Sequence, residues 1–230
     1  MKRICVALVG DFSVKIHTLV ALNDAIEHCR KHLDFLLETT WVPTTWLPRD
    51  GFDKTLYQGC WVVPGSPYKD DEAVLNIIKW ARENDFPLLG TCGGFQYMIL
   101  EYARNVLKIA NAIHEEINPD ATNPIILKLA CSLKGRQEEV NIEEDSWLRR
   151  VLGSEKIMGH FYCSYGFNDI YRHEFKDPFC FTATSVEGEV RACELKKHRF
   201  FNGTLFQPSL DSTEDQPNPL IMDFFRTVAG

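Results

Sequence analysis

Short apolar runs alternate with stretches of helical periodicity through the first half of the chain. Apolar runs that predict β-strands occupy residues 4–9, 35–42, 60–65 and 86–90. Between and after these runs, residues 15–33, 69–84 and 94–106 repeat apolar side chains every three or four positions, which predicts helices. Continuous apolar strands separated by amphipathic helices are typical of a parallel sheet with helices on both faces.

The pattern changes after residue 120, where strand candidates follow one another closely. They occupy residues 125–129, 156–160, 179–184, 190–195 and 203–206. A short helix is expected at 145–152, capped by Asp145 or Ser146, and a last helix at 219–228. The acidic stretch 138–145 is interpreted as a solvated loop. With no repeat or linker, we expect one α/β domain over residues 1–230, in three layers, with antiparallel strands added to a mostly parallel sheet.

The composition and charge of the chain disfavour several classes of protein. Hydrophobic residues make up 45% of the chain, and 25 basic against 32 acidic residues give a net charge of −7. That balance does not favour nucleic acid or anionic lipid as a partner. The longest uncharged run, 86–100, is broken by Pro87 and three glycines, so no membrane span is expected. The first residues read as a strand rather than a signal peptide, which predicts a cytoplasmic protein. No Cys or His spacing indicates a metal, and no cofactor is implied.

One motif carries candidate chemistry, Gly90-Thr91-Cys92-Gly93-Gly94, which lies between a predicted strand and a predicted helix. This is the arrangement of a nucleophile elbow, G-x-C-x-G, whose turn is too tight for larger side chains at the outer glycines. A thiol at a helix N-terminus favours the thiolate, and the amide after it can donate to an oxyanion. Cys92 is therefore predicted to be the nucleophile.

Several stretches together resemble the class I (triad) glutamine amidotransferases, and within them the glutaminase domain of cytidine triphosphate synthase. The elbow continues as Phe95-Gln96, and Trp61-Val62-Val63-Pro64-Gly65-Ser66 resembles the family's earlier glycine loop. Ser164-Tyr165-Gly166-Phe167-Asn168 is similar to the family's R-Y-x-V-N stretch. The likeness covers nearly the whole chain, without an attached synthetase domain. It implies the same fold and an amide or amino-acid-like small-molecule substrate.

The resemblance assigns roles to individual residues. Cys92 falls on the nucleophile, while Gly65 and Gly93 fall on the two oxyanion-hole loops. Substrate-contacting positions fall on Gln96 and Tyr165, and Glu115 falls, with a one-residue gap, on the acidic residue that holds the substrate ammonium. Three positions depart from the family pattern: Gln207 replaces the triad histidine, Ser209 replaces its carboxylate partner, and Ser164 replaces an arginine that grips the glutamine carboxylate.

Because of these departures, the sequence does not decide which residue acts as the general acid–base group. Gln207 has no titratable group, and losing general acid–base catalysis costs roughly 10²–10⁴ in rate. His114, beside Glu115, is one candidate for the missing role, and His160 is another. Glu115 itself could move protons if burial raised its pKa.

Three functions remain open from the sequence. The first is a stand-alone, cysteine-dependent hydrolase or transferase acting on glutamine or a γ-glutamyl-type amide. The second is an inactive binding or regulatory protein of the same fold, which the changes at Gln207 and Ser209 favour. The third is a hydrolase similar to dienelactone hydrolases, in which His198 and Asp169 or Asp177 would join Cys92. A separate synthetase subunit and a second copy of the chain are both open as partners.

Overall fold

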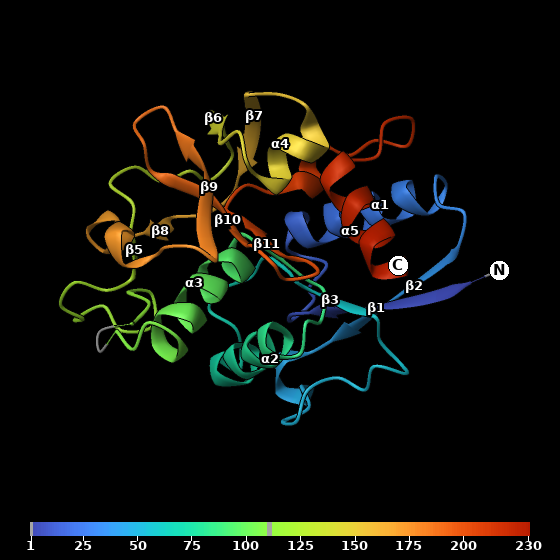
Figure 1. The fold of residues 1–230 in the computed structure, drawn as a ribbon, viewed down its shortest axis with the longest axis horizontal. Helices are drawn as coiled ribbons and strands as arrows, with labels where there is room; N and C mark the ends of the chain where they lie inside the picture. The colour runs from blue at the N-terminus through green and yellow to red at the C-terminus, as the bar shows by residue number, and fades with distance from the viewer. Residues whose placement is uncertain (1, 110–111) are drawn as a thin grey trace.

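A computed structural model describes residues 2–109 and 112–230. Within these ranges, a nine-stranded sheet runs through the molecule in the order β2-β1-β3-β4-β11-β10-β9-β6-β7 (Figure 1). The five strands that pair in parallel are β1 (Arg3–Val9), β2 (Leu36–Val42), β3 (Gly59–Val62), β4 (Leu88–Thr91) and β11 (Phe201–Thr204).

Antiparallel strands extend this sheet on one side. They are β10 (Val190–Leu195), β9 (Phe179–Ser185), β6 (Arg136–Ile142) and β7 (Lys156–Phe161). A separate two-stranded sheet pairs β5 (Ile126–Lys128) with β8 (Tyr165–Phe167). Strands from the first half of the chain, joined by β11, thus form the parallel part of the sheet, and strands from the second half add the antiparallel part, as the sequence predicts.

Helices cover the sheet in two groups. On one side α2 (Asp71–Glu83) packs against α3 (Gly93–Asn105). On the other, α5 (Pro219–Ala229) contacts both α1 (His17–Arg30) and α4 (Trp147–Leu152) (Figure 1). Short 3-10 helices are η1 (Thr44–Trp46), η2 (Asp169–Glu174) and η3 (Pro208–Asp211). This layering confirms the predicted α/β architecture.

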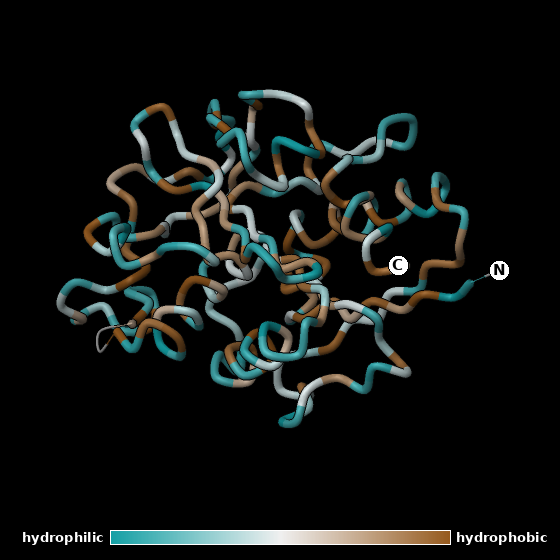
Figure 2. The backbone as a smooth tube through the Cα atoms, in the orientation of Figure 1, coloured by the Kyte–Doolittle hydropathy of each residue, from teal (hydrophilic) through white to brown (hydrophobic). Residues whose placement is uncertain are grey.

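The core lies between these layers, where the central strands are fully buried. All four residues of β3 and of β4 are buried, which explains why both read as unbroken apolar runs. Figure 2 shows the same contrast, with hydrophobic backbone at the centre and hydrophilic backbone in the outer loops.

Several details of the secondary structure differ from the sequence predictions, among them β8, which was not predicted as a strand. The acidic stretch 138–145 was expected to be a loop, but its first half is part of β6. Val140 and Ile142 are buried while their neighbours are not, so this is a half-buried antiparallel strand held between β7 and β9. The last strand begins at Phe201 rather than at 203, because its pairing with β4 starts at Leu88.

Candidate active site

The turn between β4 and α3 has the geometry of an elbow. Cys92 has φ +53° and ψ −107°, a conformation rarely adopted by residues other than glycine, and its N–H donates to the carbonyl of Thr204 at 2.9 Å. A Cβ on Gly94 would lie 2.1 Å from the carbonyl oxygen of Val62, and one on Gly90 would lie 2.4 Å from Met98 Sδ. The two glycines therefore allow α3 to start directly above the sheet, with Cys92 at its N-terminus.

The Cys92 thiol is mostly buried, with 6% of the residue exposed. A hydrogen bond from the Cys163 thiol lowers the pKa of Cys92, against the opposing effect of burial. The Gly93 N–H and the Gln207 side chain lower this pKa further. The hydrogen bond to Cys92 raises the pKa of Cys163, so Cys92 is the more readily deprotonated thiol of the two. In its protonated form, Cys92 Sγ donates to the carbonyl of Tyr162 at 3.8 Å. The pair thus favours a nucleophilic thiolate.

A cavity of about 280 Å³ opens beside this thiol. Its wall comes from the loops after β3 and β7, from the start of α3, and from segments distant in sequence. The lining residues are Ile16, Thr18, Pro64, Gly65, Ser66, Cys92, Gln96, Glu116, Lys134, Tyr162, Cys163, Ser164, Tyr165 and Gln207. Most of them lie at the carboxyl edge of the parallel strands, where ligands bind in open α/β sheets.

The two glycine segments assigned to an oxyanion hole come together at this cavity. Gly65 lines the wall and has φ +140°, in the region that favours glycine. A Cβ on Gly93 would lie 2.9 Å from the backbone nitrogen of Ser66, so the loop after β3 lies directly against the start of α3. Backbone amides from both loops therefore lie close to the Cys92 thiol.

Gln96 is fixed on the cavity wall by three hydrogen bonds. Its Oε1 accepts from Ser66 Oγ at 3.2 Å and contacts His114 Nε2 at 3.1 Å, while its Nε2 donates to the carbonyl of Tyr165 at 2.8 Å. An amide nitrogen carries two protons, so among the described residues one N–H of Gln96 has no acceptor.

His114 orients Gln96 from behind. It is 1% exposed, and its Nδ1 accepts the N–H of Glu116 at 3.2 Å, which assigns the ring proton to Nε2 and toward Gln96. Burial lowers the pKa of His114 to about 4, so the ring is neutral near pH 7. Both ring nitrogens of His114 are engaged, and the ring does not line the cavity.

The acidic side chain at the cavity is that of Glu116, one residue after the position that the resemblance indicates. Glu115 accepts the backbone N–H of Lys128 at 2.6 Å and does not line the cavity. Glu116 lines it and contacts Ser66 Oγ at 3.4 Å. Burial raises the pKa of Glu116, while Ser66 and the charge of Lys134 oppose that rise. The neighbouring side chains of Glu115 and Glu116 therefore have different surroundings. Sequence spacing alone could not decide which of them lines the cavity.

The triad positions have distinct environments. Gln207 lines the cavity beside Cys92, and its Oε1 is buried with no hydrogen-bond partner among the described residues. Ser209 is buried in η3 and is not part of the cavity wall. Within the described ranges no histidine lines this cavity, and the carboxylate that does line it belongs to Glu116.

The other histidine candidates do not line the cavity. His160 is bonded through Nδ1 to Asp211 and through Nε2 to Gln137, and it does not line the cavity. His198 contacts the carbonyl of Ala81 through Nε2 at 3.2 Å, on another part of the molecule. The Cys–Asp–His arrangement of the dienelactone hydrolase hypothesis is therefore not formed around Cys92.

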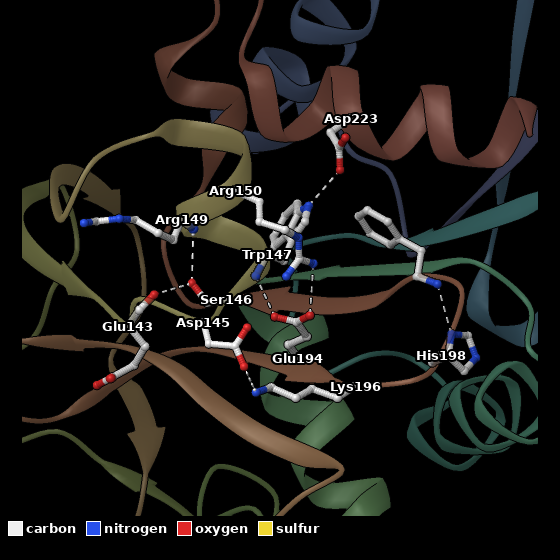
Figure 3. Close-up of polar contacts among 11 residues, drawn as sticks. Glu143, Asp145, Ser146, Trp147, Arg149, Arg150, Glu194, Lys196, His198 and Asp223 are labelled. Carbon is white, nitrogen blue, oxygen red and sulfur yellow. Dashed lines mark hydrogen bonds and ion pairs between the residues drawn. The ribbon is translucent and has the colours of Figure 1, made fainter.

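A larger cavity of about 660 Å³ lies on the face covered by α4 and α5. Its polar groups pair with one another (Figure 3): Glu194 accepts the N–H of Trp147 at 2.6 Å and an Arg150 N–H at 3.2 Å. The Trp147 ring N–H donates to Asp223 at 2.8 Å. These contacts tie α4 to β10 and α5, and no cysteine lines this cavity. The chemistry-bearing site is therefore the smaller one.

Comparisons with known proteins agree with this geometry. The family model described as glutamine amidotransferase class-I matches residues 19–227. CTP synthase of Methanopyrus kandleri is 29% identical over 243 residues, covering 99% of this chain and 45% of its own length. CTP synthase of Sulfurisphaera tokodaii is 28% identical over 242 residues, covering 100% of this chain and 46% of its own length. The chain thus spans less than half the length of these relatives.

Solved structures show the same fold. The glutaminase domain of Trypanosoma brucei CTPS, solved with bound acivicin, has a TM-score of 0.84 at 22% identity, covering 98% of this chain and 94% of that one. A glutamine amidotransferase from Thermotoga maritima has a TM-score of 0.60 at 10% identity, covering 98% and 96%. Within the described ranges, no helix combines the length and the apolar composition needed to span a bilayer.

Proposed function

Because the chain belongs to the class I glutamine amidotransferase family, we propose that it hydrolyses or transfers the side-chain amide of glutamine or of a γ-glutamyl-type substrate, with Cys92 as the nucleophile. One observation carries the proposal: a thiol of lowered pKa at the N-terminus of α3 opens into a cavity of about 280 Å³. Such a thiol is poised to attack a carbonyl carbon.

In the proposed reaction, the Cys92 thiolate adds to the amide carbonyl and forms a tetrahedral intermediate. Backbone N–H groups of Gly65 and Gly93 hold its oxyanion. The C–N bond then breaks, ammonia leaves with one added proton, and a thioester remains on Cys92. Water attacks the thioester, which releases the carboxylate product and returns the thiol; an amine acceptor would give transfer instead.

The substrate is oriented by groups on the cavity wall. The free N–H of Gln96 is available to a substrate oxygen, since the other N–H is held by Tyr165. Glu116 takes the role of binding the substrate ammonium that the resemblance gave to Glu115, because its carboxylate is the one on the wall. Tyr165 lines the same cavity, and its carbonyl accepts the hydrogen bond from Gln96.

Protonation of the leaving ammonia is the step that this site supports least. Gln207 cannot accept or donate a proton by titration, so the leaving ammonia takes its proton from water or from the Cys163 thiol. General acid–base catalysis is worth about 10²–10⁴ in rate, and we expect turnover of glutamine to be slower by that order than with a histidine at position 207.

Covalent labelling tests the nucleophile without requiring turnover. The purified chain is treated with a glutamine-like diazoketone, and separately with iodoacetamide, and adducts are located by peptide mass spectrometry. We expect one adduct per chain on Cys92 with the diazoketone, absent in Cys92→Ser and unchanged in Cys131→Ser, which removes an exposed thiol. Labelling by iodoacetamide alone would refute a glutamine-like substrate.

A second candidate function is favoured by Gln207, whose buried Oε1 has no partner among the described residues. An unsatisfied acceptor in the pocket suits a ligand that donates a hydrogen bond and stays bound. The chain would then bind an amide or amino acid without cleaving it. Failure of both reagents to label Cys92, together with measurable binding of L-glutamine, would support this function over hydrolysis.

A partner is a further part of the proposal. The chain spans less than half the length of its CTP synthase relatives, so a synthetase activity that uses ammonia would come from another polypeptide or region. Size-exclusion chromatography with light scattering on the purified chain distinguishes a monomer from a second copy bound to the first.

A further inference from the structure

The cavity of about 660 Å³ on the face covered by α4 and α5 is a separate concave site, because none of its lining residues lines the cavity beside Cys92. Sites for small organic molecules have volumes of roughly 300–1,000 Å³. The walls include the side chains of Trp147, Phe200 and Met222, each no more than 5% exposed. The cavity therefore has room and apolar surface for the body of a small organic ligand.

One buried polar group of this cavity stands outside the pairs drawn in Figure 3. Asn202 lines the cavity from β11 and is 5% exposed. Its side-chain amide offers one acceptor and two donors, but it forms no hydrogen bond of 3.5 Å or less within the described ranges. Its cross-strand neighbour is Glu194, whose two carboxylate oxygens already accept from Trp147 and Arg150. Because buried polar groups are rarely left unpaired, the Asn202 amide indicates a polar partner inside the cavity.

Positive charge exceeds negative charge on the lining of this cavity, although the chain as a whole has a net charge of −7. Besides histidines, its charged residues are three arginines and two carboxylates, namely Arg150, Arg199, Arg226, Glu194 and Asp223. Each carboxylate is already engaged, Glu194 as described above and Asp223 by the ring N–H of Trp147. A ligand that completes the pairing therefore carries negative charge.

Two of these arginines have no carboxylate partner. Within residues 2–109 and 112–230, neither Arg199 nor Arg226 forms an ion pair of 4.0 Å or less. Arg199 donates to the carbonyls of Thr227 and Val228 at 2.7 and 3.4 Å, which holds it beside the last turn of α5. Arg226 lies on that turn and is exposed, and its guanidinium donates no hydrogen bond among the same residues. The planar fork of an arginine matches the oxygens of a carboxylate or phosphate.

We propose that this cavity binds a small organic anion, whose carboxylate or phosphate group pairs with Arg226 beside Arg199 while an uncharged hydrogen-bonding group reaches Asn202. The apolar walls cover the body of the ligand. This site requires neither the Cys92 nucleophile nor the proposed amide chemistry, and it forms no covalent bond.

Rigid benzene derivatives separate the two polar contacts, with affinities measured by calorimetry on the full chain. Carbamoylbenzoate, substituted in para, carries an anion and an amide; benzoate lacks the amide, and benzamide lacks the charge. Para-carbamoylphenyl phosphate exchanges the carboxylate for a phosphate. We expect at least one of the two carbamoyl anions to bind 10-fold or more tightly than benzamide, about the effect of one charge-assisted hydrogen bond, and the tighter of the two identifies the anionic group.

Variants locate the bound probe. Arg226→Met should weaken binding of the preferred carbamoyl anion about 10-fold and leave benzamide unchanged. Asn202→Leu, which is close in size, should weaken carbamoylbenzoate about 5-fold and leave benzoate unchanged. Arg49→Met removes an exposed arginine that does not line the cavity, and it should have no effect. Asn202 lies within the sheet, so Arg226→Met carries the test if Asn202→Leu does not fold.

The proposal is overturned if neither carbamoyl anion binds, if benzamide binds as tightly as both of them, or if Arg226→Met binds them as Arg49→Met does. Equal weakening of benzoate and carbamoylbenzoate in Asn202→Leu would remove Asn202 from the site. Cys92→Ser should bind the probes unchanged; a loss of affinity there would place them in the other cavity and reject this site. Labelling of Cys92 by the diazoketone is a separate readout, so the proposed function stands or falls independently.

Discussion

Cys163 and Cys92 are two neighbouring buried thiols, and the hydrogen bond from Cys163 is the largest cause of the lowered pKa of Cys92. Cys163→Ala removes that donor and leaves a small, apolar side chain. We expect alkylation of Cys92 by iodoacetamide near pH 7 to slow by about 10-fold, since a hydrogen bond to a charged group is lost. The pH midpoint of alkylation should also move upward.

The measurement is the peptide-resolved rate of Cys92 alkylation from pH 5 to 10. Cys131→Ala, at an exposed thiol away from the cavity, is the matched control and should behave as the unmodified chain does. An identical pH profile for Cys163→Ala would show that Cys163 does not hold the thiolate.

The resemblance assigns Gln207 and Ser209 to the positions of the family's histidine and carboxylate. The double change Gln207→His with Ser209→Glu restores a general base and its orienting partner. We expect release of ammonia from L-glutamine to rise about 10²–10⁴-fold, the contribution of general acid–base catalysis. A coupled ammonia assay measures it, and the same pair of changes in Cys92→Ser should give no gain.

At the scale of elements, the elbow depends on the close approach of β3, β4 and α3. A Cβ on Gly94 would meet a backbone oxygen of Val62 at 2.1 Å, and backbone cannot rotate away as a side chain can. We expect Gly94→Ala to lower the free energy of unfolding by more than about 3 kcal/mol, the scale of severe overpacking.

Gly135→Ala is the comparison for this experiment. Gly135 also has a positive φ, +71°, but a Cβ there would meet nothing within 4 Å. Gly135→Ala should lower the free energy of unfolding by only about 1 kcal/mol, which is the cost of placing alanine in this backbone conformation. Thermal and urea unfolding of both variants provide the values; equal losses would mean that the elbow tolerates a methyl group and that its glycines are not required by packing.

At the scale of the whole molecule, stability should depend on pH through His114. Its pKa is about 4 in the folded chain, against about 6.5 for an unperturbed histidine, so the unfolded chain binds more protons between these values. The contribution of the neutral His114 ring to the stability of the folded chain is complete above pH 6.5. It is lost as the pH falls toward 4. Over that window the contribution is about 3 kcal/mol.

His114→Gln keeps an amide that can bond to Gln96 but does not titrate. We expect its free energy of unfolding to fall less steeply than that of the unmodified chain between pH 6.5 and 4. His173→Gln is the control, because the His173 side chain is 74% exposed. Parallel pH curves for His114→Gln and the unmodified chain would contradict the neutral, buried state of this ring.

Local pattern was enough to predict the fold class and the elbow. The strand, the nucleophile and the helix of the elbow are adjacent in sequence, so Gly90, Cys92 and Gly94 reveal it without tertiary information. Fully buried parallel strands can also be recognised in the sequence, because they appear as continuous apolar runs. The strand β6 was not predicted because only one of its faces is buried. The acidic residues on its other face make the sequence look like a solvated loop.

The chemistry around the elbow was decided by tertiary structure. Whether Glu115 or Glu116 faces the cavity depends on how a loop pairs with β5, through the bond from Lys128 N–H to Glu115, and not on spacing. Cys163 and Lys134 line the same cavity as Cys92 because the loops after β7 and β5 are hydrogen-bonded to each other. A pocket joins side chains from distant segments, and a sequence pattern reports only on neighbours along the chain.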